Sequence, residues 1–312
     1  MVDPTVSGLF AAVYSYIDEA ILPAQPWAEF KTIFHDYRDR RASSLHAYVD
    51  TLPLHTCVAA GGQADRAIPL AAAWVFYILA ARVFDDLQDS EGTEYAWNGG
   101  GLQGALPIGL YAIGVAQTAL SFLDDDRCAE IVGGLGNTLA LSAIAQSRQL
   151  TLDSLSTEEY FEILAAKTGF VFATGARAGA LMAAECADTA VVEALYEYGL
   201  NTGIAAQIAD DCYDLVEYDL QNNTLSLPII YALAQKQHVQ YPQFLASLRD
   251  LPTQPTSSEI ITSFLKKVGA VEWSLRVARV YQTRALAALE QFPEETVRPL
   301  INYVSRNLNV PP

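Results

Sequence analysis

The most restrictive feature of this sequence is an apolar stretch that ends in a cluster of acids. Residues 67–84 carry hydrophobic side chains around nearly the whole helical circumference, and Asp85-Asp86-Leu87-Gln88-Asp89 follows directly. A helix without a polar face belongs in the centre of a bundle. Carboxylates at the end of such a helix are costly to bury unless a positive charge compensates them. The stretch therefore predicts a core helix whose far end has a function.

Helical spacing of apolar residues continues along almost the whole chain of 312 residues, of which 51% are hydrophobic. Alternating strand patterns are absent, so we predict an all-α protein built as one domain over residues 1–312. Its architecture is a bundle of roughly ten or more helices. The expected helices cover residues 6–22, 67–89, 106–123, 130–150, 157–184, 189–215 and 258–291.

Charge and composition exclude several classes of function. The net charge is −17 and no basic run is present, so we expect no nucleic-acid partner. The four cysteines form no CxxC pair, which leaves zinc and redox motifs unsupported. No leader pattern opens the sequence, and the longest apolar run is shorter than the ~20 residues that span a bilayer. We therefore expect a cytoplasmic protein without an integral membrane segment.

The acid spacing of the first motif recurs once. Asp85 and Asp89 are four residues apart, which places them on one face of a helix, ~6 Å from each other. The segment Asp210-Asp211-Cys212-Tyr213-Asp214 repeats this spacing, and it too ends an apolar stretch. Oxygen clusters of this kind suit magnesium, which keeps several waters and bridges to substrate phosphates.

A single motif of this type is more often a solvated helix face than a metal site. Two copies, each ending a hydrophobic helix, favour the metal site. Facing one another across a bundle, the two motifs would hold several magnesium ions around a diphosphate. The ions would neutralise the leaving group, and apolar walls would accept a hydrocarbon tail and a carbocation.

At this point the chain resembles the trans-prenyl diphosphate synthase (polyprenyl synthetase) family, which has the class I terpenoid synthase fold. The resemblance runs over most of the chain, roughly from Gly61 to Arg306. It rests on five segments that occur in the family's order: Gly61-Gly62 with Arg66 and Pro69, the first aspartate motif, Lys167-Thr168-Gly169 after Glu159-Tyr160, Gln207 with the second aspartate motif, and Leu227-Pro228-Ile229-Ile230-Tyr231-Ala232-Leu233.

The resemblance implies a central hydrophobic cavity and a magnesium cofactor, with three ions around a bound diphosphate. It implies metal ligands at Asp85, Asp86, Asp89, Asp210, Asp211 and Asp214. The central catalytic roles fall to Asp85, Asp89, Lys167 and Asp210. The prenyl diphosphate substrate is expected to contact Arg66, Arg82, Lys167, Thr168, Gln207, Tyr77, Ala80 and Ala81. A homodimer is expected as well, with residues 106–120 as a candidate interface.

The chain departs from the family at the second, basic diphosphate pocket. Gln63 replaces the lysine of the glycine-rich segment, Ile78 replaces a polar residue, and residues 91–101 contain no base. The lysine expected near Thr224 is also replaced. Each lost charged contact weakens diphosphate binding by ~1.5–3 kcal/mol. We therefore expect an enzyme that ionises an allylic diphosphate but acts as a terpene cyclase or an atypical prenyltransferase.

Two alternatives to that function stay open. One is ordinary chain elongation with isopentenyl diphosphate, held by bases that the motifs do not reveal. The other is a non-catalytic regulatory subunit of a synthase, which the intact aspartate motifs disfavour.

Two local assignments, at Arg82 and Tyr77, also have alternatives. Arg82 contacts the diphosphate, or it forms an i,i+4 salt bridge with Asp86. Tyr77 closes the tail pocket ~12 Å from Asp85, which suggests a tail of about C15–C20, or it is an ordinary core residue that faces another helix. Residues 98–101 are expected to form a loop near the mouth of the site.

Overall fold

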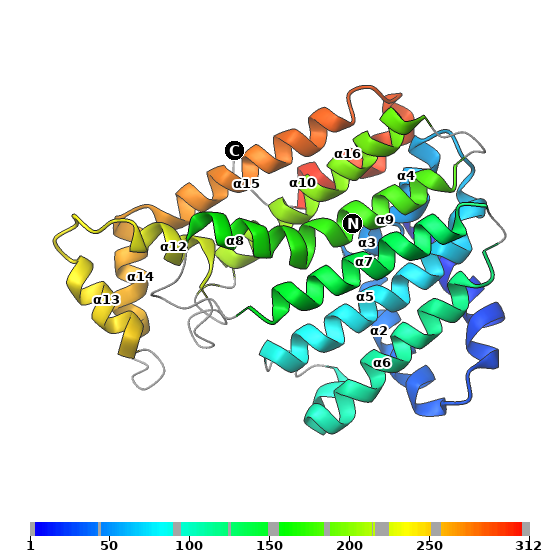
Figure 1. The fold of residues 1–312 in the computed structure, drawn as a ribbon, viewed down its shortest axis with the longest axis horizontal. Coiled ribbons are helices and arrows are strands. Elements are labelled where there is room, and N and C mark those ends of the chain that lie inside the picture. The colour runs from blue at the N-terminus through cyan, green and yellow to red at the C-terminus, as the bar shows by residue number, and fades with distance from the viewer. Residues whose placement is uncertain are drawn as a thin grey trace. The chain divides into compact units, whose positions relative to one another are not determined.

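The computed structural model describes residues 4–42, 45–89, 95–123, 126–148, 156–183, 188–213, 215, 225–250 and 257–307. Over this part of the chain the regular structure is helical and contains no strand, which confirms the predicted all-α class (Figure 1). The α-helices are α1 (Pro4–Tyr16), α2 (Ala28–Arg41), α3 (His46–Asp50), α4 (Leu52–Ala59), α5 (Ile68–Asp89), α6 (Gly101–Leu120), α7 (Cys128–Gln146), α8 (Thr157–Leu164), α9 (Phe170–Leu181), α10 (Thr189–Tyr213), α12 (Leu227–Leu233), α13 (Tyr241–Asp250), α14 (Ser257–Lys267), α15 (Ala270–Ala288) and α16 (Glu294–Asn307).

Short turns of other helix types connect or extend these helices. Two are π-helical, η1 (Ile17–Ile21) and η5 (Ala165–Gly169). Three are 3-10 helical, η2 (Leu22–Ala24), η3 (Ala64–Ala67) and η4 (Ala96–Gly100).

The chain forms two compact units. The first contains Met1–Gly136, Thr174–Tyr196 and Leu289–Tyr303, and the second contains Asn137–Ala173, Glu197–Ala288 and Val304–Pro312. The first aspartate motif therefore lies in the first unit and the second motif in the second. A single domain over residues 1–312 stays a prediction.

Helix α5 is the core of the first unit, as its apolar sequence predicts. Its side chains Trp74, Phe76 and Leu79 are fully buried. Helix α6 runs beside α5 (Figure 1). The approach is close because α6 has a glycine at the contact: a Cβ on Gly109 would lie 2.6 Å from the ring of Phe84. This contact fixes the last turns of α5, where the aspartates begin.

A buried ion pair joins α2 to α3 in the same unit. The Nε of Arg41 donates to Oδ2 of Asp50 at 2.8 Å, and the Tyr14 hydroxyl donates to the same oxygen at 2.9 Å. Both charged side chains are almost inaccessible to solvent. A buried charge pair is tolerated only when its hydrogen bonds are made. Helix α2, which apolar spacing alone does not predict, is thus held by polar contacts as well as by its buried aromatic residues.

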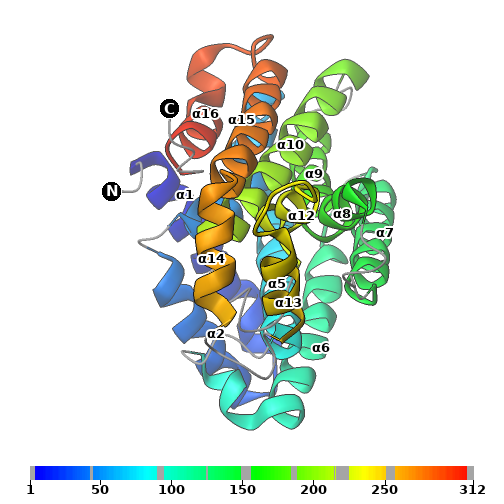
Figure 2. The same ribbon diagram turned by 90° about the vertical axis from the view of Figure 1, so that its left-hand side faces the viewer.

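The second unit is built on two apolar clusters. One contains Phe244 and Phe264 from α13 and α14, which lie side by side (Figure 2). The other gathers Tyr160 of α8, Ile208 of α10 and Leu227 of α12. Because Ile208 comes two residues before Asp210, the second cluster holds the end of α10 against α8 and α12.

The helix boundaries differ from the predicted ones in several places, and the expected helix over residues 6–22 becomes the turns η1 and η2 after Tyr16. The expected helix over residues 157–184 contains the π-helical turn η5, and the one over residues 258–291 is divided at Gly269. Gly269 has a φ of +66°, a conformation in which glycine ends helices. The expected loop at residues 98–101 is the end of η4 and the start of α6. The predicted start at Thr157 is confirmed, because the Ser156 side chain accepts a hydrogen bond from the Glu159 N–H at 3.0 Å.

Two stretches of the described chain are long and apolar enough to cross a membrane. They are Ala64–Gln88 and Cys128–Gln146. The first is mostly buried inside the protein, as a core helix is, and the second is largely exposed. Core helices of water-soluble proteins reach the same length and composition, so these stretches are weak indications of a membrane segment.

Candidate active site

The first aspartate motif occupies the last turns of α5. Asp85 is half-buried, whereas Asp86 is only 2% exposed. Asp89 is the last residue of the helix, and its side chain lies outside the described part of the structure. Carboxylates at the C-terminal end of a helix oppose the helix dipole. A bound cation would relieve this repulsion.

Asp86 is held by side chains from η4. The indole N–H of Trp97 donates to Asp86 Oδ2 at 3.0 Å, and the Asn98 amide donates to the same oxygen at 3.4 Å. Burial raises the pKa of Asp86, and the Arg82 charge and the two hydrogen bonds lower it in part. Sequence reasoning assigned no role to Trp97, and it placed Asn98 in a loop.

Arg82 forms the i,i+4 ion pair that the sequence offered as one of two alternatives. Its Nε lies 2.8 Å from Asp86 Oδ1. Neither atom has an aligned hydrogen bond among the described residues, so charge attraction joins them. The Arg82 side chain is 40% exposed and its guanidinium lies 6.0 Å from the Tyr95 ring centroid. A contact between Arg82 and a diphosphate stays a prediction.

The expected tail-pocket residues point in different directions from α5. Ala80 is buried and Ala81 is exposed, as adjacent helical positions allow. The Tyr77 hydroxyl accepts a hydrogen bond from the Gln117 amide of α6, and burial raises the pKa of Tyr77. Tyr77 therefore faces another helix, as its alternative assignment expected. Its role at the pocket floor stays a prediction.

Arg66 lies on the 3-10 turn that precedes α5. Its side chain is exposed, as is that of Gln63 just before the turn. Gly61 makes the sharp turn out of α4 with a φ of +89°. The glycine-rich segment therefore presents the cationic Arg66, the neutral Gln63 and the acidic Asp65 to solvent.

The second aspartate motif ends α10 in the other unit. Asp210 is exposed and Asp211 is half-buried, and Asp214 lies outside the described residues. The Tyr160 hydroxyl of α8 donates to Asp211 Oδ2 at 2.6 Å, and the Gln207 amide donates to Oδ1 at 3.1 Å. Gln207 in turn accepts a hydrogen bond from Thr168 at 2.8 Å. Three predicted site residues thus form one network with a tyrosine to which sequence reasoning gave no role.

The π-helical turn η5 brings the Lys-Thr-Gly segment to this network. Extra residues in a turn of this type often occur at functional sites. A Cβ on Gly203 of α10 would lie 2.8 Å from the Thr168 carbonyl oxygen, so the two backbones meet only because residue 203 is glycine. Burial raises the pKa of Asp211 most strongly. Hydrogen bonds from Tyr160, Gln207 and the Leu227 backbone, together with the Lys167 charge, lower it in part.

The donor set fits magnesium in its chemistry. Each motif offers adjacent carboxylates at a helix C-terminus, and hard oxygen ligands are what this ion requires. Among the described residues, no three His, Cys, Asp or Glu side chains lie close enough together to hold a metal ion. The side chains of Asp89 and Asp214, which would complete each set, are outside this part of the structure.

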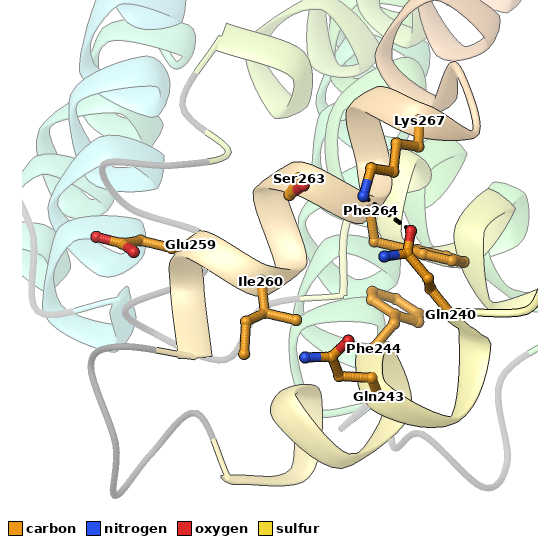
Figure 3. Close-up of a pocket in the computed structure, with 8 residues that line it drawn as sticks. All are labelled: Gln240, Gln243, Phe244, Glu259, Ile260, Ser263, Phe264 and Lys267. Atoms are coloured by element: carbon orange, nitrogen blue, oxygen red, sulfur yellow. Dashed lines mark hydrogen bonds between the residues drawn. The ribbon is translucent and has the colours of Figure 1, made fainter.

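A separate small cavity lies between α13 and α14. It has a volume of about 260 Å³ and is lined by both helices, with Lys267 bound to Gln240 at 2.9 Å (Figure 3). None of its lining residues is a predicted site residue. We assign it no part in the site.

We predict that Tyr160→Phe lowers the free energy of unfolding by ~1.5–3 kcal/mol, because a carboxylate loses a partly buried hydrogen bond. Tyr281→Phe is the matched control. The Tyr281 ring packs in the same cluster, and its hydroxyl has no hydrogen bond to any described residue. Its expected effect is within ~0.5 kcal/mol. Urea unfolding of the two variants measures the difference, and equal losses would show that the Tyr160–Asp211 bond contributes nothing.

Comparison with known proteins places this fold and these motifs in one family. A family model described as Polyprenyl synthetase matches residues 51–264. Solanesyl-diphosphate synthase 1 of Oryza sativa is 25% identical over 169 residues, which is 51% of this chain and 36% of that protein. Geranylgeranyl diphosphate synthase of Saccharolobus solfataricus is 22% identical over 272 residues, 79% of this chain and 80% of that protein.

The matched part of this chain spans 36%, 48% and 59% of three curated relatives, including the rice protein. Among solved structures, a polyprenyl synthase from Caulobacter crescentus, complexed with calcium and isoprenyl diphosphate, matches with a TM-score of 0.82 at 24% identity. The match covers 96% of this chain and 94% of that one, and it confirms the predicted fold. The relatives are named as synthases and transferases. The family model covers more than half of the chain, so the family predicted from the motifs is confirmed. The chain belongs to the polyprenyl synthetase family.

Proposed function

We propose that the protein is a magnesium-dependent prenyl diphosphate synthase, which ionises an allylic diphosphate and extends it with isopentenyl diphosphate. The observation that supports this proposal most is that α5 and α10 each end in adjacent carboxylates, in a chain of this family. This proposal reverses the preference drawn from sequence alone, because the similar proteins are named as solanesyl and geranylgeranyl diphosphate synthases. We expect the reaction to occur in the cytoplasm.

In this proposal the aspartates hold magnesium around the diphosphate. The ions, three in the complete site, would neutralise the leaving group as the bond to the allylic carbon breaks. Lys167 supplies a positive charge to the diphosphate. Thr168 donates a hydrogen bond to Gln207, and Gln207 in turn orients Asp211. Arg66 is the cation of the glycine-rich segment that we assign to the second diphosphate.

The tail of the allylic substrate would pass along α5. Ala80 leaves room beside the first motif, and Tyr77 lies about two turns before Asp85, some ~12 Å along the helix. With Tyr77 held by Gln117, its ring is a fixed obstacle rather than a mobile one. We propose a tail of about C15–C20, set by this distance.

A single-substrate reaction is the second candidate, and one observation favours it. Gln63 is neutral and exposed where the family's motif has a lysine, and Ile78 is apolar where a polar side chain is expected. The second diphosphate would therefore meet fewer cations. Two lost contacts of ~1.5–3 kcal/mol each would weaken its binding on the order of a thousandfold. The allylic cation would then be quenched by its own double bond, by water or by another acceptor.

We also propose that the protein is a homodimer formed through α6. Leu102, Leu106 and Leu110 are spaced four residues apart and are between 39% and 62% exposed, so they form an apolar stripe on the outer face of this helix. An exposed stripe of large apolar side chains marks an interaction site in a soluble protein. A second copy of the chain is the occupant that we propose, because the same stripe on two copies is self-complementary about a two-fold axis.

To test the reaction, the purified protein is incubated with magnesium and geranyl, farnesyl or geranylgeranyl diphosphate, with and without isopentenyl diphosphate. We expect longer diphosphates only when both substrates are present. Asp85→Asn should lower this turnover by ~100-fold or more, since it removes a ligand of the charge-neutralising ion. Asp126→Asn, which changes an exposed acid in a turn, is the control.

Two results of this assay would contradict chain elongation. Hydrocarbon or alcohol from an allylic diphosphate alone would support the single-substrate candidate. No conversion of any allylic diphosphate, in the presence of magnesium, would contradict both candidates.

To test the dimer, Leu106→Glu and Leu110→Glu are introduced together and the mass in solution is measured by light scattering. The wild type should have twice the mass of one chain, and the variant should have the mass of one chain, because charges on the stripe are costly to bury. Val239→Glu changes a solvent-exposed apolar residue of the second unit and should leave the mass unchanged. A wild-type protein with the mass of one chain would contradict the proposal.

A further inference from the structure

Trp97 is a large, buried side chain in η4, a short turn that is otherwise made of small and polar residues. It is 1% exposed, and its one hydrogen-bond donor is directed to Asp86 Oδ2 at 3.0 Å. It belongs to the stretch of residues 91–101, which contains no base. The segment therefore contacts the first aspartate motif through a neutral indole N–H.

The indole ring is clamped in this orientation. The Tyr95 ring stacks on it with centroids 4.2 Å apart and an interplanar angle of 8°, and the Tyr37 ring lies at 6.2 Å. The guanidinium of Arg40 lies 5.3 Å from the Tyr95 ring centroid and adds a cation–π contact. Trp97 cannot turn away from Asp86 without breaking this stack.

Of the two hydrogen bonds that Asp86 accepts from Trp97 and Asn98, the one from Trp97 is the shorter. The Asn98 amide is at 3.4 Å, which is near the limit of a hydrogen bond. Arg82 is at 2.8 Å but is not aligned for a hydrogen bond with Oδ1. With a side chain this deeply buried, the Trp97 N–H is the strongest directional contact that fixes the carboxylate.

The second motif has the same arrangement with different residues. Asp211 accepts hydrogen bonds from an aromatic donor, the Tyr160 hydroxyl at 2.6 Å, and from the Gln207 amide at 3.1 Å. In each motif the second aspartate is held by one aromatic donor and one amide. The first aspartate of each motif, Asp85 or Asp210, is the more exposed of the two.

We propose that Trp97, assisted by Asn98, is a positioning residue for the first magnesium site. It holds Asp86 and thereby fixes the last turn of α5, so that Asp85 and Asp89, four residues apart on one helical face, keep the spacing that ions need. Asp86 then acts on the site by orienting the helix end. This inference rests on the proposed function, because it takes the first motif to bind magnesium with a diphosphate.

The test compares Trp97→Phe with Trp74→Phe. Phenylalanine keeps an aromatic ring and removes the N–H. Trp74 lies on α5, the helix that ends in the first motif, and is buried to a similar extent as Trp97. Its indole donates to the Val49 carbonyl at 2.8 Å, away from the motif. We expect Trp97→Phe to raise the magnesium concentration for half-maximal turnover by ~10–100-fold, as loss of a contact to a ligand-holding group does. Trp74→Phe should leave that concentration unchanged, even if it lowers stability.

A second measurement does not need turnover. Labelling with ¹⁵N-tryptophan gives one indole N–H signal for each of the four tryptophans, and the Trp97 signal is assigned as the one missing from Trp97→Phe. Asp86→Asn should shift this signal and leave that of Trp74 in place. Magnesium with inorganic pyrophosphate should also shift it.

The outcomes separate this inference from the function. If the wild type converts substrate but both tryptophan variants respond equally to magnesium, the positioning role is overturned and the function stands. If the wild type converts no substrate but the Trp97 signal moves with magnesium and pyrophosphate, the positioning role stands and the proposed reaction fails. If neither Asp86→Asn nor magnesium with pyrophosphate shifts the Trp97 indole signal, the positioning role is overturned.

Discussion

Negative charge at the C-terminal ends of two apolar helices is the constraint on which the rest of the structure depends. Such a helix end already carries partial negative charge, and adjacent carboxylates add to it, with Asp86 almost inaccessible to water and Asp211 half-buried. The protein compensates only part of this charge. Arg82 pairs with Asp86 in the first unit, and Lys167 lowers the pKa of Asp211 in the second, yet burial still raises the pKa of both acids. The remaining charge is what a divalent ion bound to a diphosphate would balance.

Each unit uses different local chemistry to hold its aspartates. In the first, an indole within a stack of aromatic rings holds Asp86, and Gly109 lets α6 approach the last turns of α5. In the second, a tyrosine and a glutamine hold Asp211, and the contact at Gly203 brings the π-helical turn with its lysine and threonine close to α10. In both units, a close contact at a glycine packs the helix just before the aspartates in the sequence, and hydrogen bonds then hold the aspartate side chains. The orientation of the acids thus follows from backbone approach as much as from hydrogen bonds.

The sequence predicts the parts of this arrangement that periodicity and spacing encode. Helix α5 could be recognised from its unbroken apolar run, and the start of α8 from a capping serine, because both signals are local. The roles of Trp97 and Tyr160 could not, since each depends on a partner at a distance in the sequence, at positions 86 and 211. Arg82 is an intermediate case: the i,i+4 spacing offered its ion pair, but spacing alone could not choose between that pair and a substrate contact. The sequence alone favours a single-substrate reaction because missing cations are visible in a sequence, whereas the names of the similar proteins favour chain elongation.

The proposed function requires that both aspartate motifs act on one diphosphate through magnesium. Calorimetric titration of a non-reactive allylic diphosphate analogue, with magnesium in excess, tests it most directly when the wild type is compared with Asp85→Asn and Asp210→Asn. The account predicts one analogue bound per chain, dependent on magnesium, with each single substitution weakening that one binding event. Two analogues bound per chain, with each substitution removing only one of them, would show that the motifs work separately and would contradict it.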